Sequence, residues 1–311
     1  MLMTKRKSKS PEFSVRDFFQ RFPDDEACLN HIMEVRFGMR HTCHKCGVES
    51  TFHRSKTPGQ KTGSKTTKAR RSFICSSCGN HLHPTAGTIF EDSRTPLQLW
   101  FYAIFLFVTT RHGVSGKELQ RQLGVTYKTA WRIGHKIREL IDNEGNFELL
   151  KGHVEADEAY VGGYRAGKRG RGAAGKTVVM GIKERGGRIH AETIPNVKKP
   201  TLRGVVNEKV EKGSVVSTDE LRSYNLLPED GYIHGAVRHG EKEWTYYDYR
   251  QKVTHHTNSV ESFWKLFKKS VASTHIHVSA KYMNRYLAEF TFRSNNRRME
   301  NAMFDLLISR I

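Results

Sequence analysis

The chain of 311 residues carries 52 Lys and Arg against 32 Asp and Glu, for a net charge of +20, and 37% of its residues are hydrophobic. This length suits two domains, or one large domain with small modules attached. Five cysteines are too few for a disulfide scaffold, no apolar core follows the basic amino terminus, and the apolar run at 97–108 is shorter than the ~20 residues that span a bilayer. We therefore expect a protein of the reducing cytoplasm without a membrane partner.

The positive charge is spread along the chain. Residues 1–150 contain 24 Lys and Arg against 14 Asp and Glu, and the remainder contains 28 against 18, so each part carries +10. Basic side chains that neutralise phosphates release condensed counterions, so this distribution favours a polyanion bound along the whole protein. Nucleic acid is the leading candidate, and a basic protein without such a partner is the alternative.

The first 93 residues predict a helical segment over 1–38 and a zinc ribbon over 39–93. In the helical segment, an acidic first turn after Pro23 marks the start of the second of two short helices. In the ribbon, two Cys-x-x-Cys pairs can each place two thiolates on one ion, which completes a tetrahedral zinc site. Redox chemistry is the alternative for such pairs, and a long basic loop separates them. The four candidate zinc ligands are Cys43, Cys46, Cys75 and Cys78.

Residues 94–145 predict a helical DNA-binding module. An aromatic-rich helix over 97–110 belongs to the core, and two further helices follow, one capped by Ser115 and one beginning at Thr126, with Gly124 between them. This is the pattern of a helix-turn-helix, although two packed helices joined by glycine also occur without DNA. The second helix would present Tyr127, Lys128, Arg132 and Lys136 to a major groove.

A predicted strand over 154–163 carries three carboxylates, Glu155, Asp157 and Glu158. Glu155 and Asp157 share one face of the strand, and Glu158 lies on the other. Neighbouring carboxylates repel unless a cation lies between them, so a divalent metal site competes with a solvated edge strand. The glycine-rich loop that follows could close on a phosphate backbone, or be a solvated hairpin tip. Its basic residues include Arg165, Lys168, Arg169 and Arg171.

Two further acidic residues follow in the second half of the chain. Paired strands over 177–183 and 188–194 and a helix over 199–212 lead to a strand over 214–220 that contains Asp219, a typical position for chemistry in α/β sheets. A helix over 254–270 carries Glu261, which could also be the third residue of a capping box with Asn258 as the cap. Helices over 287–298 and 299–311 close the chain. The polar stripe of the helix over 254–270 consists of Asn258, Glu261, Lys265 and Lys268.

Several segments together resemble bacterial insertion-sequence DDE transposases of the subgroup with an N-terminal zinc ribbon and helix-turn-helix. The likeness runs from residue 18 to residue 298. It implies an α/β fold in which an RNase H-like catalytic domain over 151–298, a mixed sheet flanked by helices, follows the two small modules and precedes a C-terminal helix over 299–311. The segments that carry it are 22–28, 85–91, 127–131, 155–163, 217–219 and 256–268.

The resemblance also implies a function. A transposase of this kind binds the terminal inverted repeats of double-stranded DNA, cleaves them, and joins the 3′-hydroxyl to target DNA by phosphoryl transfer with two Mg²⁺ or Mn²⁺ ions. One zinc ion would be structural, and synapsis of two ends favours a homodimer or higher multimer associated with the nucleoid. A catalytically inert DNA-binding regulator and a Mg²⁺-dependent nuclease of the same fold are the alternatives.

By the same resemblance, Asp157 and Asp219 are the first two metal ligands. Glu261 is favoured as the third, because a carboxylate binds Mg²⁺ better than an amide and because Lys268 completes the family's Glu-x₆-Lys pattern. Asn258 stays open as an alternative, since Lys265 follows it at the same spacing.

Overall fold

The computed structural model describes residues 13–55, 61–62, 65–66, 71–142, 148–162, 175–299 and 302–311. The predicted basic-loop residues Arg165, Lys168, Arg169 and Arg171 lie outside these ranges. The chain divides into two compact units. One unit contains Met1–Thr109, Arg121–Leu140 and Met299–Ile311, and the other contains Thr110–Gln120 and Ile141–Arg298.

Helices α1 (Val15–Arg21), α2 (Asp25–Arg36), α3 (Leu97–Thr109) and α9 (Met303–Ile308) belong to the first unit. The carboxylate of Asp24 accepts the Ala27 N–H at 2.8 Å, which confirms the predicted start of the second helix. The ring of Phe304 lies 5.4–6.2 Å from four aromatic rings on or next to α1 and α3. The carboxyl-terminal helix therefore completes a core whose other members come from the first third of the chain: Phe13, Phe18, Phe22 and Phe101.

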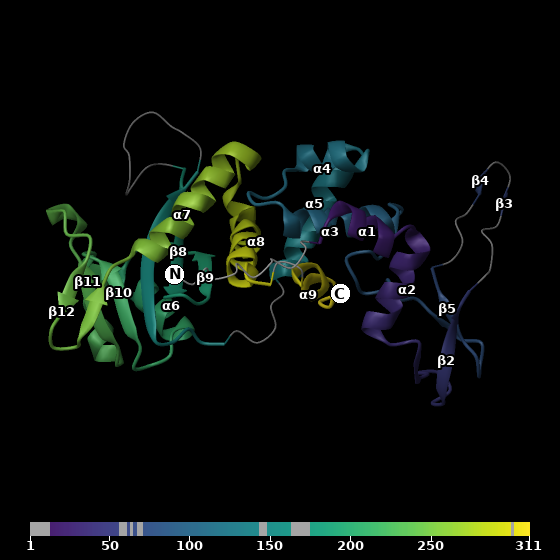
Figure 1. The fold of residues 1–311 in the computed structure, drawn as a ribbon, viewed down its shortest axis with the longest axis horizontal. Coiled ribbons are helices and arrows are strands. Elements are labelled where there is room, and N and C mark those ends of the chain that lie inside the picture. Colours follow the sequence, from purple (N-terminus) through teal and green to yellow (C-terminus); the bar gives the residue numbers. More distant parts are fainter. Residues whose placement is uncertain are drawn as a thin grey trace, which may run out of the picture. The chain divides into compact units, whose positions relative to one another are not determined.

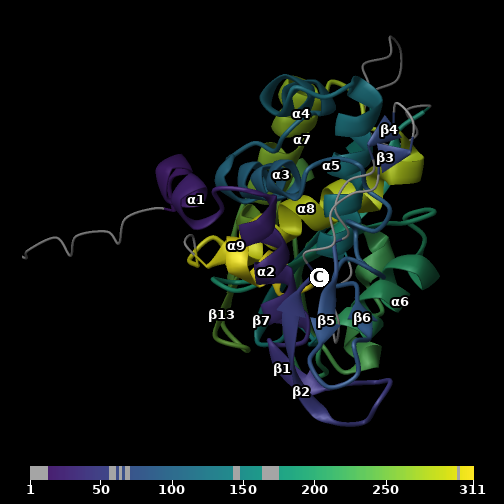
Figure 2. The same ribbon diagram turned by 90° about the vertical axis from the view of Figure 1, so that its right-hand side faces the viewer.

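The ribbon is a four-stranded sheet in the order β1-β2-β5-β6, with every neighbouring pair antiparallel (Figure 2). A separate two-stranded pair lies between β2 and β5 in the sequence. The strands are β1 (Arg40–Thr42), β2 (Glu49–Arg54), β3 (Lys61–Thr62), β4 (Lys65–Thr66), β5 (Phe73–Cys75) and β6 (His81–Leu82).

Two helices joined by a short turn confirm the helical pattern predicted after residue 113: α4 (Gly116–Leu123) and α5 (Tyr127–Asp142). The Ser115 hydroxyl accepts the Glu118 N–H at 3.1 Å, and α4 ends at Gly124 with φ +62°. A residue in this left-handed region favours glycine, because a Cβ would be strained there.

The second unit is built on a five-stranded sheet in the order β11-β10-β7-β8-β9 (Figure 1). Pairs β10·β11 and β10·β7 are parallel, whereas β7·β8 and β8·β9 are antiparallel, so the predicted mixed sheet is confirmed. The strands are β7 (His153–Val161), β8 (Thr177–Glu184), β9 (Ile189–Thr193), β10 (Val215–Asp219) and β11 (Ile233–Val237).

Helices cover both faces of this sheet. Met180 of β8 belongs to a buried cluster with α6 (Lys199–Lys209), while its neighbour Val179 belongs to a second cluster with α7 (Asn258–Ser270) and α8 (Met283–Asn296). Side chains alternate along a strand, so the two clusters lie on opposite faces. Short helical turns complete the unit: η1 (Arg222–Tyr224), η2 (Leu227–Asp230), η3 (His239–Glu241), η4 (Val271–His275) and η5 (Ala280–Tyr282).

The helix predicted over 254–270 begins later than expected. Strand β13 (Val253–His255) pairs antiparallel with β12 (Tyr246–Asp248), so the chain is extended until shortly before α7. Thr257 is the N-cap and Asn258 is the first helical residue, so the predicted capping box with Asn258 as its cap is wrong. Over the described ranges, the helices are too short or too polar to cross a membrane.

Candidate active site and metal centres

The four predicted zinc ligands converge. Their Sγ atoms all lie within 4.8 Å of one another, and the Sγ atoms of Cys43 and Cys78 are 3.8 Å apart. A tetrahedron with Zn–S bonds of ~2.3 Å has edges of about 3.8 Å. Each Cys-x-x-Cys turn closes on a glycine with φ near +70°, Gly47 and Gly79, whose N–H groups bond the carbonyls of Cys43 and Cys75. The donor set and its spacing fit one zinc ion.

The surroundings of Cys75 favour its thiolate. Burial raises the pKa of this thiol, but the Ser50 hydroxyl and the backbone N–H groups of Cys78 and Ser77 lower it more strongly, to about 6. A thiolate is the form that binds metal. Cys78 has the opposite shift: a backbone hydrogen bond from Asn80 lowers the pKa of its thiol, but burial and its contacts with the other three cysteines together raise it to about 11. Without an ion, the cluster therefore favours a thiolate at Cys75 and a protonated thiol at Cys78.

Two of the three predicted magnesium ligands lie side by side. The parallel register pairs Glu155 of β7 with Ser217 of β10, and continuing it by two residues brings Asp157 opposite Asp219. Carboxylate oxygens of Asp157, Asp219 and Glu158 all lie within 4.8 Å of one another. The strand order and the register thus create an acidic cluster from residues 62 positions apart.

Glu158 is the member that sequence reasoning set aside. It faces the opposite side of β7 from Asp157, as predicted, but lies where the pairing of β7 with β10 has ended, and its carboxylate accepts a hydrogen bond from the Tyr224 hydroxyl. Burial and the neighbouring carboxylate raise the pKa of Tyr224 well above its usual value, so this phenol stays protonated and donates. The only sequence signal that Glu158 belongs to the acidic cluster was its position beside Asp157 on the predicted strand.

The acidic cluster is electrostatically unfavourable by itself. Burial, followed by the charges of Glu158, Asp219 and Glu261, raises the pKa of Asp157 from 3.8 to about 8. Carboxylate oxygens are the ligands that Mg²⁺ prefers, and a bound cation favours their charged form. The chemistry of the donors therefore fits a divalent metal ion.

Glu261 lies on the first turn of α7, close enough for its charge to act on Asp157 but outside the group of three carboxylates within 4.8 Å. The Thr257 hydroxyl donates to its carboxylate at 2.8 Å, and the His239 Nε2 lies 3.6 Å from it. Asn258 is exposed. For Lys268, partial desolvation lowers the pKa of the ammonium and the charge of Asp157 raises it. Of the two candidates, only Glu261 carries a charge, and that charge raises the pKa of Asp157.

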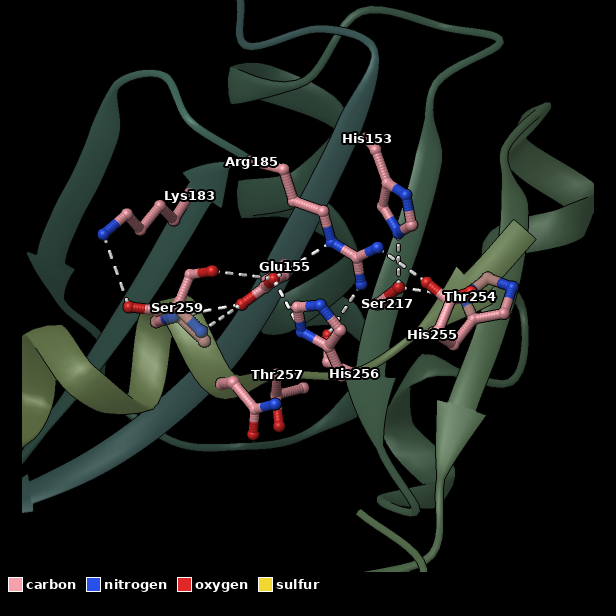
Figure 3. A network of polar contacts seen from close by, with 12 residues as sticks. His153, Glu155, Lys183, Arg185, Ser217, Thr254, His255, His256, Thr257 and Ser259 are labelled. Carbon is pink, nitrogen blue, oxygen red and sulfur yellow. Dashed lines mark hydrogen bonds and ion pairs between the residues drawn. The ribbon is translucent and has the colours of Figure 1, made fainter. Parts of the chain in front are cut away.

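Glu155 has a different environment from the acidic cluster (Figure 3). Its side chain is fully buried, and its carboxylate accepts the Ser259 N–H at 2.7 Å, the Val260 N–H at 3.1 Å and the Ser259 hydroxyl at 3.0 Å. The Arg185 Nε donates to it at 3.1 Å, and the His256 Nδ1 lies 3.0 Å away. This carboxylate is satisfied by the protein, whereas those of the acidic cluster converge on one another.

The predicted DNA-contacting side chains of α5 are exposed. Lys128, Arg132 and Lys136 recur every four residues and so share one side of the helix, whereas Tyr127, which is 46% exposed, lies half a turn around the helix from Lys136. Buried Ala130 and Ile133 lie on the side away from Lys128 and Arg132. Lys136 also pairs with Glu139 at 3.0 Å, and the Arg132 guanidinium lies 5.8 Å from the Trp100 ring. Lys265 of α7 is exposed too. The four described positions on α5 are Tyr127, Lys128, Arg132 and Lys136.

Two family models match separate parts of the chain. A family model described as the ISXO2-like transposase domain matches residues 149–295, and one described as the transposase zinc-ribbon domain matches residues 23–81. The chain thus carries an ISXO2-like transposase domain, preceded by a transposase zinc ribbon. The two matches cover the sheet with its acidic cluster and the ribbon with its four cysteines.

Two relatives of this transposase agree with that assignment. An uncharacterized protein in transposable element ISH50 of Halobacterium salinarum is 27% identical over 289 residues, covering 88% of the transposase and 91% of the relative. An uncharacterized transposase-like protein of Haemophilus influenzae is 27% identical over 109 residues, covering 35% of the transposase and 82% of the relative. The similarity to the first therefore extends across both units.

Proposed function

We propose that this protein is an active DDE transposase, which binds the terminal inverted repeats of an insertion sequence, cleaves them, and joins the 3′-hydroxyl to target DNA. The observation that supports this most is the convergence of Asp157 and Asp219 from two parallel strands, with Glu261 near enough to raise the pKa of Asp157. A protein that only bound DNA would gain nothing from like charges facing the phosphates.

In this proposal Asp157, Asp219 and Glu261 hold two Mg²⁺ or Mn²⁺ ions. Ions bound there would activate the attacking hydroxyl on one side and stabilise the leaving oxygen on the other. The rest of the site is cationic. Lys268 is close enough to Asp157 for the charge of that carboxylate to raise the pKa of its ammonium group, and Lys265 is exposed one turn earlier on α7. Both ammonium groups can bind phosphates of the DNA end. We assign the third ligand to Glu261 rather than Asn258, which is exposed.

The amino-terminal modules would recognise the DNA ends. Helix α5 exposes Tyr127, Lys128, Arg132 and Lys136, side chains that can bind phosphates and base edges in a major groove. The zinc ribbon adds a second contact. Because both ends of an element must be held together during joining, we propose that the protein acts as a homodimer or higher multimer, in the cytoplasm on the nucleoid.

A strand-transfer assay with labelled inverted-repeat ends tests the proposal. We expect joined product with Mg²⁺, and a loss of about 10³-fold or more in Asp157→Asn, Asp219→Asn and Glu261→Gln, since several kcal/mol of transition-state stabilisation would disappear. Gel shifts should show end binding nearly unchanged in all three.

The control is Glu184→Gln, because Glu184 of β8 bonds the N–H groups of Lys151 and Arg188 and is not among the proposed ligands. Nicking without joining would identify a nuclease, and binding without cleavage would identify an inert regulator. Full activity in Glu261→Gln would assign the third ligand to Asn258.

A further inference from the structure

One face of β7 carries polar residues at every second position: His153, Glu155 and Asp157. Side chains at i, i+2 and i+4 of a strand project from the same face. Only Asp157 belongs to the acidic cluster. The other two contact the residues that lead into α7, the helix that carries Glu261.

Glu155 binds the start of α7 directly. Its carboxylate accepts the N–H groups of Ser259 and Val260, the two residues immediately before Glu261. These N–H groups have no carbonyl partner within the helix, and a negative charge at this end is favourable to the helix dipole. The cap of α7 is therefore supplied from a strand 104 residues earlier in the chain.

Arg185 extends this contact to the residues before the helix (Figure 3). While its Nε donates to Glu155, its Nη1 donates to the Thr254 carbonyl at 2.6 Å and its Nη2 to the His256 carbonyl at 3.3 Å. A guanidinium presents its donors in a rigid fork, so these bonds restrain both position and direction of the backbone. Glu155 and Arg185 thus hold residues 254–260 between them.

A second connection from the same strand face acts on the same segment. The Ser217 hydroxyl lies 2.8 Å from the His153 Nε2 and 2.8 Å from the His255 Nδ1. Ser217 and His255 are fully buried, and the Tyr246 ring stacks on His255 with centroids 5.0 Å apart. The chain entering α7 is therefore attached to β7 at two neighbouring points.

We propose that Glu155 is a positioning residue that fixes Glu261 relative to Asp157, so that one strand carries both the first metal ligand and the group that places the third. This inference rests on the proposed function. A buried carboxylate could instead serve general stability alone. If Glu155 served stability alone, its contacts would not need to lie next to Glu261. Instead, its carboxylate binds the N–H groups of Ser259 and Val260, and Val260 directly precedes Glu261.

The test measures Mn²⁺ affinity of the full-length protein in a double-mutant cycle of Glu155→Gln and Glu261→Gln. Residues that orient metal ligands typically cost 10–100-fold in affinity when replaced, so we expect Glu155→Gln to weaken Mn²⁺ binding by about tenfold. In the Glu261→Gln background, the same substitution should add less than about twofold, because coupled residues are not additive. Glu184→Gln is the matched control and should bind Mn²⁺ as the wild type does.

Hydrogen exchange followed by mass spectrometry supplies a readout independent of metal. Glu155→Gln should speed exchange in peptides covering residues 256–263, and Glu184→Gln should not. If Glu155→Gln does not fold, Arg185→Lys takes its place, since it removes the fork and leaves the carboxylate.

Equal losses of affinity in both backgrounds, or unchanged exchange at 256–263, would overturn the inference while leaving the proposed function intact. If Glu261→Gln bound Mn²⁺ as tightly as the wild type, the ligand assignment would fail instead, and Glu155 would be reduced to a structural contact.

Discussion

The zinc ribbon and the acidic cluster both bring like-charged ligands together, but they are assembled differently. In the ribbon, each Cys-x-x-Cys turn is local and closes on its own glycine, so two short segments supply four ligands at tetrahedral spacing. In the acidic cluster, Asp157 and Asp219 meet only because β7 and β10 are parallel neighbours. The position of Glu261 near this cluster depends on how α7 packs on the sheet. Local turns make a metal site that can be recognised from spacing, whereas a site assembled by a sheet depends on the whole fold.

The largest expected effect follows from removing one ribbon ligand. A structural zinc site contributes about 10–16 kcal/mol of apparent binding energy to folding in small modules, so Cys43→Ser should unfold the ribbon. We expect bound zinc, measured by atomic absorption, to fall from near one equivalent, and end binding to be lost. The described sheet of the second unit should keep its thermal transition.

Cys28→Ser is the matched control for that experiment. Cys28 is a buried thiol of α2 outside the cysteine cluster, so its replacement should leave the zinc content unchanged. A Cys43→Ser protein that was metal-free yet bound DNA ends fully would contradict the structural role of the ion.

The acidic cluster should behave in the opposite way, gaining stability when a ligand is removed. A carboxyl whose pKa is raised by folding favours the folded state while protonated. For Asp157, that contribution is complete below pH about 4 and is lost as the pH rises toward about 8. Metal-free wild-type protein should therefore lose stability over this range relative to Asp157→Asn.

Thermal unfolding at pH 5 and pH 8 with a chelator measures this difference. We expect Asp157→Asn to unfold at a higher temperature than the wild type at pH 8, by several degrees, and by less at pH 5. Added Mn²⁺ should remove the difference by stabilising only the wild type. Identical pH profiles for the two proteins would contradict the electrostatic account of the cluster.

The smallest effect is expected on α5, where the proposed contacts are exposed and separate. Arg132→Ala should weaken end binding by about 1–3 kcal/mol if the side chain reads a base edge. If it contacts only a phosphate, binding should fall for every sequence alike, and the slope of log affinity against log salt should decrease by about one. Titrations at several salt concentrations distinguish these cases, and Gln122→Ala, on α4, is the control.

Much of the fold was predictable from local patterns, for reasons visible in particular residues. Ser115 caps α4 as expected, the second helix starts just after Pro23 as predicted, and the predicted paired strands over 177–183 and 188–194 match the observed hairpin of β8 and β9. The error at α7 has a local cause: Thr254 and His255 read as a continuation of the helical pattern, but β12 pairs with them and keeps the chain extended.

Sequence alone determined the four cysteines, the two aspartates, the helix boundaries set by caps, and the basic character of both parts of the chain. Each depends on residues within a few positions of one another or on total composition. Tertiary structure decided that Glu158 joins the acidic cluster, that Phe304 fills a core whose other members come from the first third of the chain, and that Glu155 caps a helix 104 residues away. Those contacts depend on the strand order and on how the helices pack. The residues next to a buried carboxylate or phenylalanine in the sequence do not indicate which distant residues it will contact.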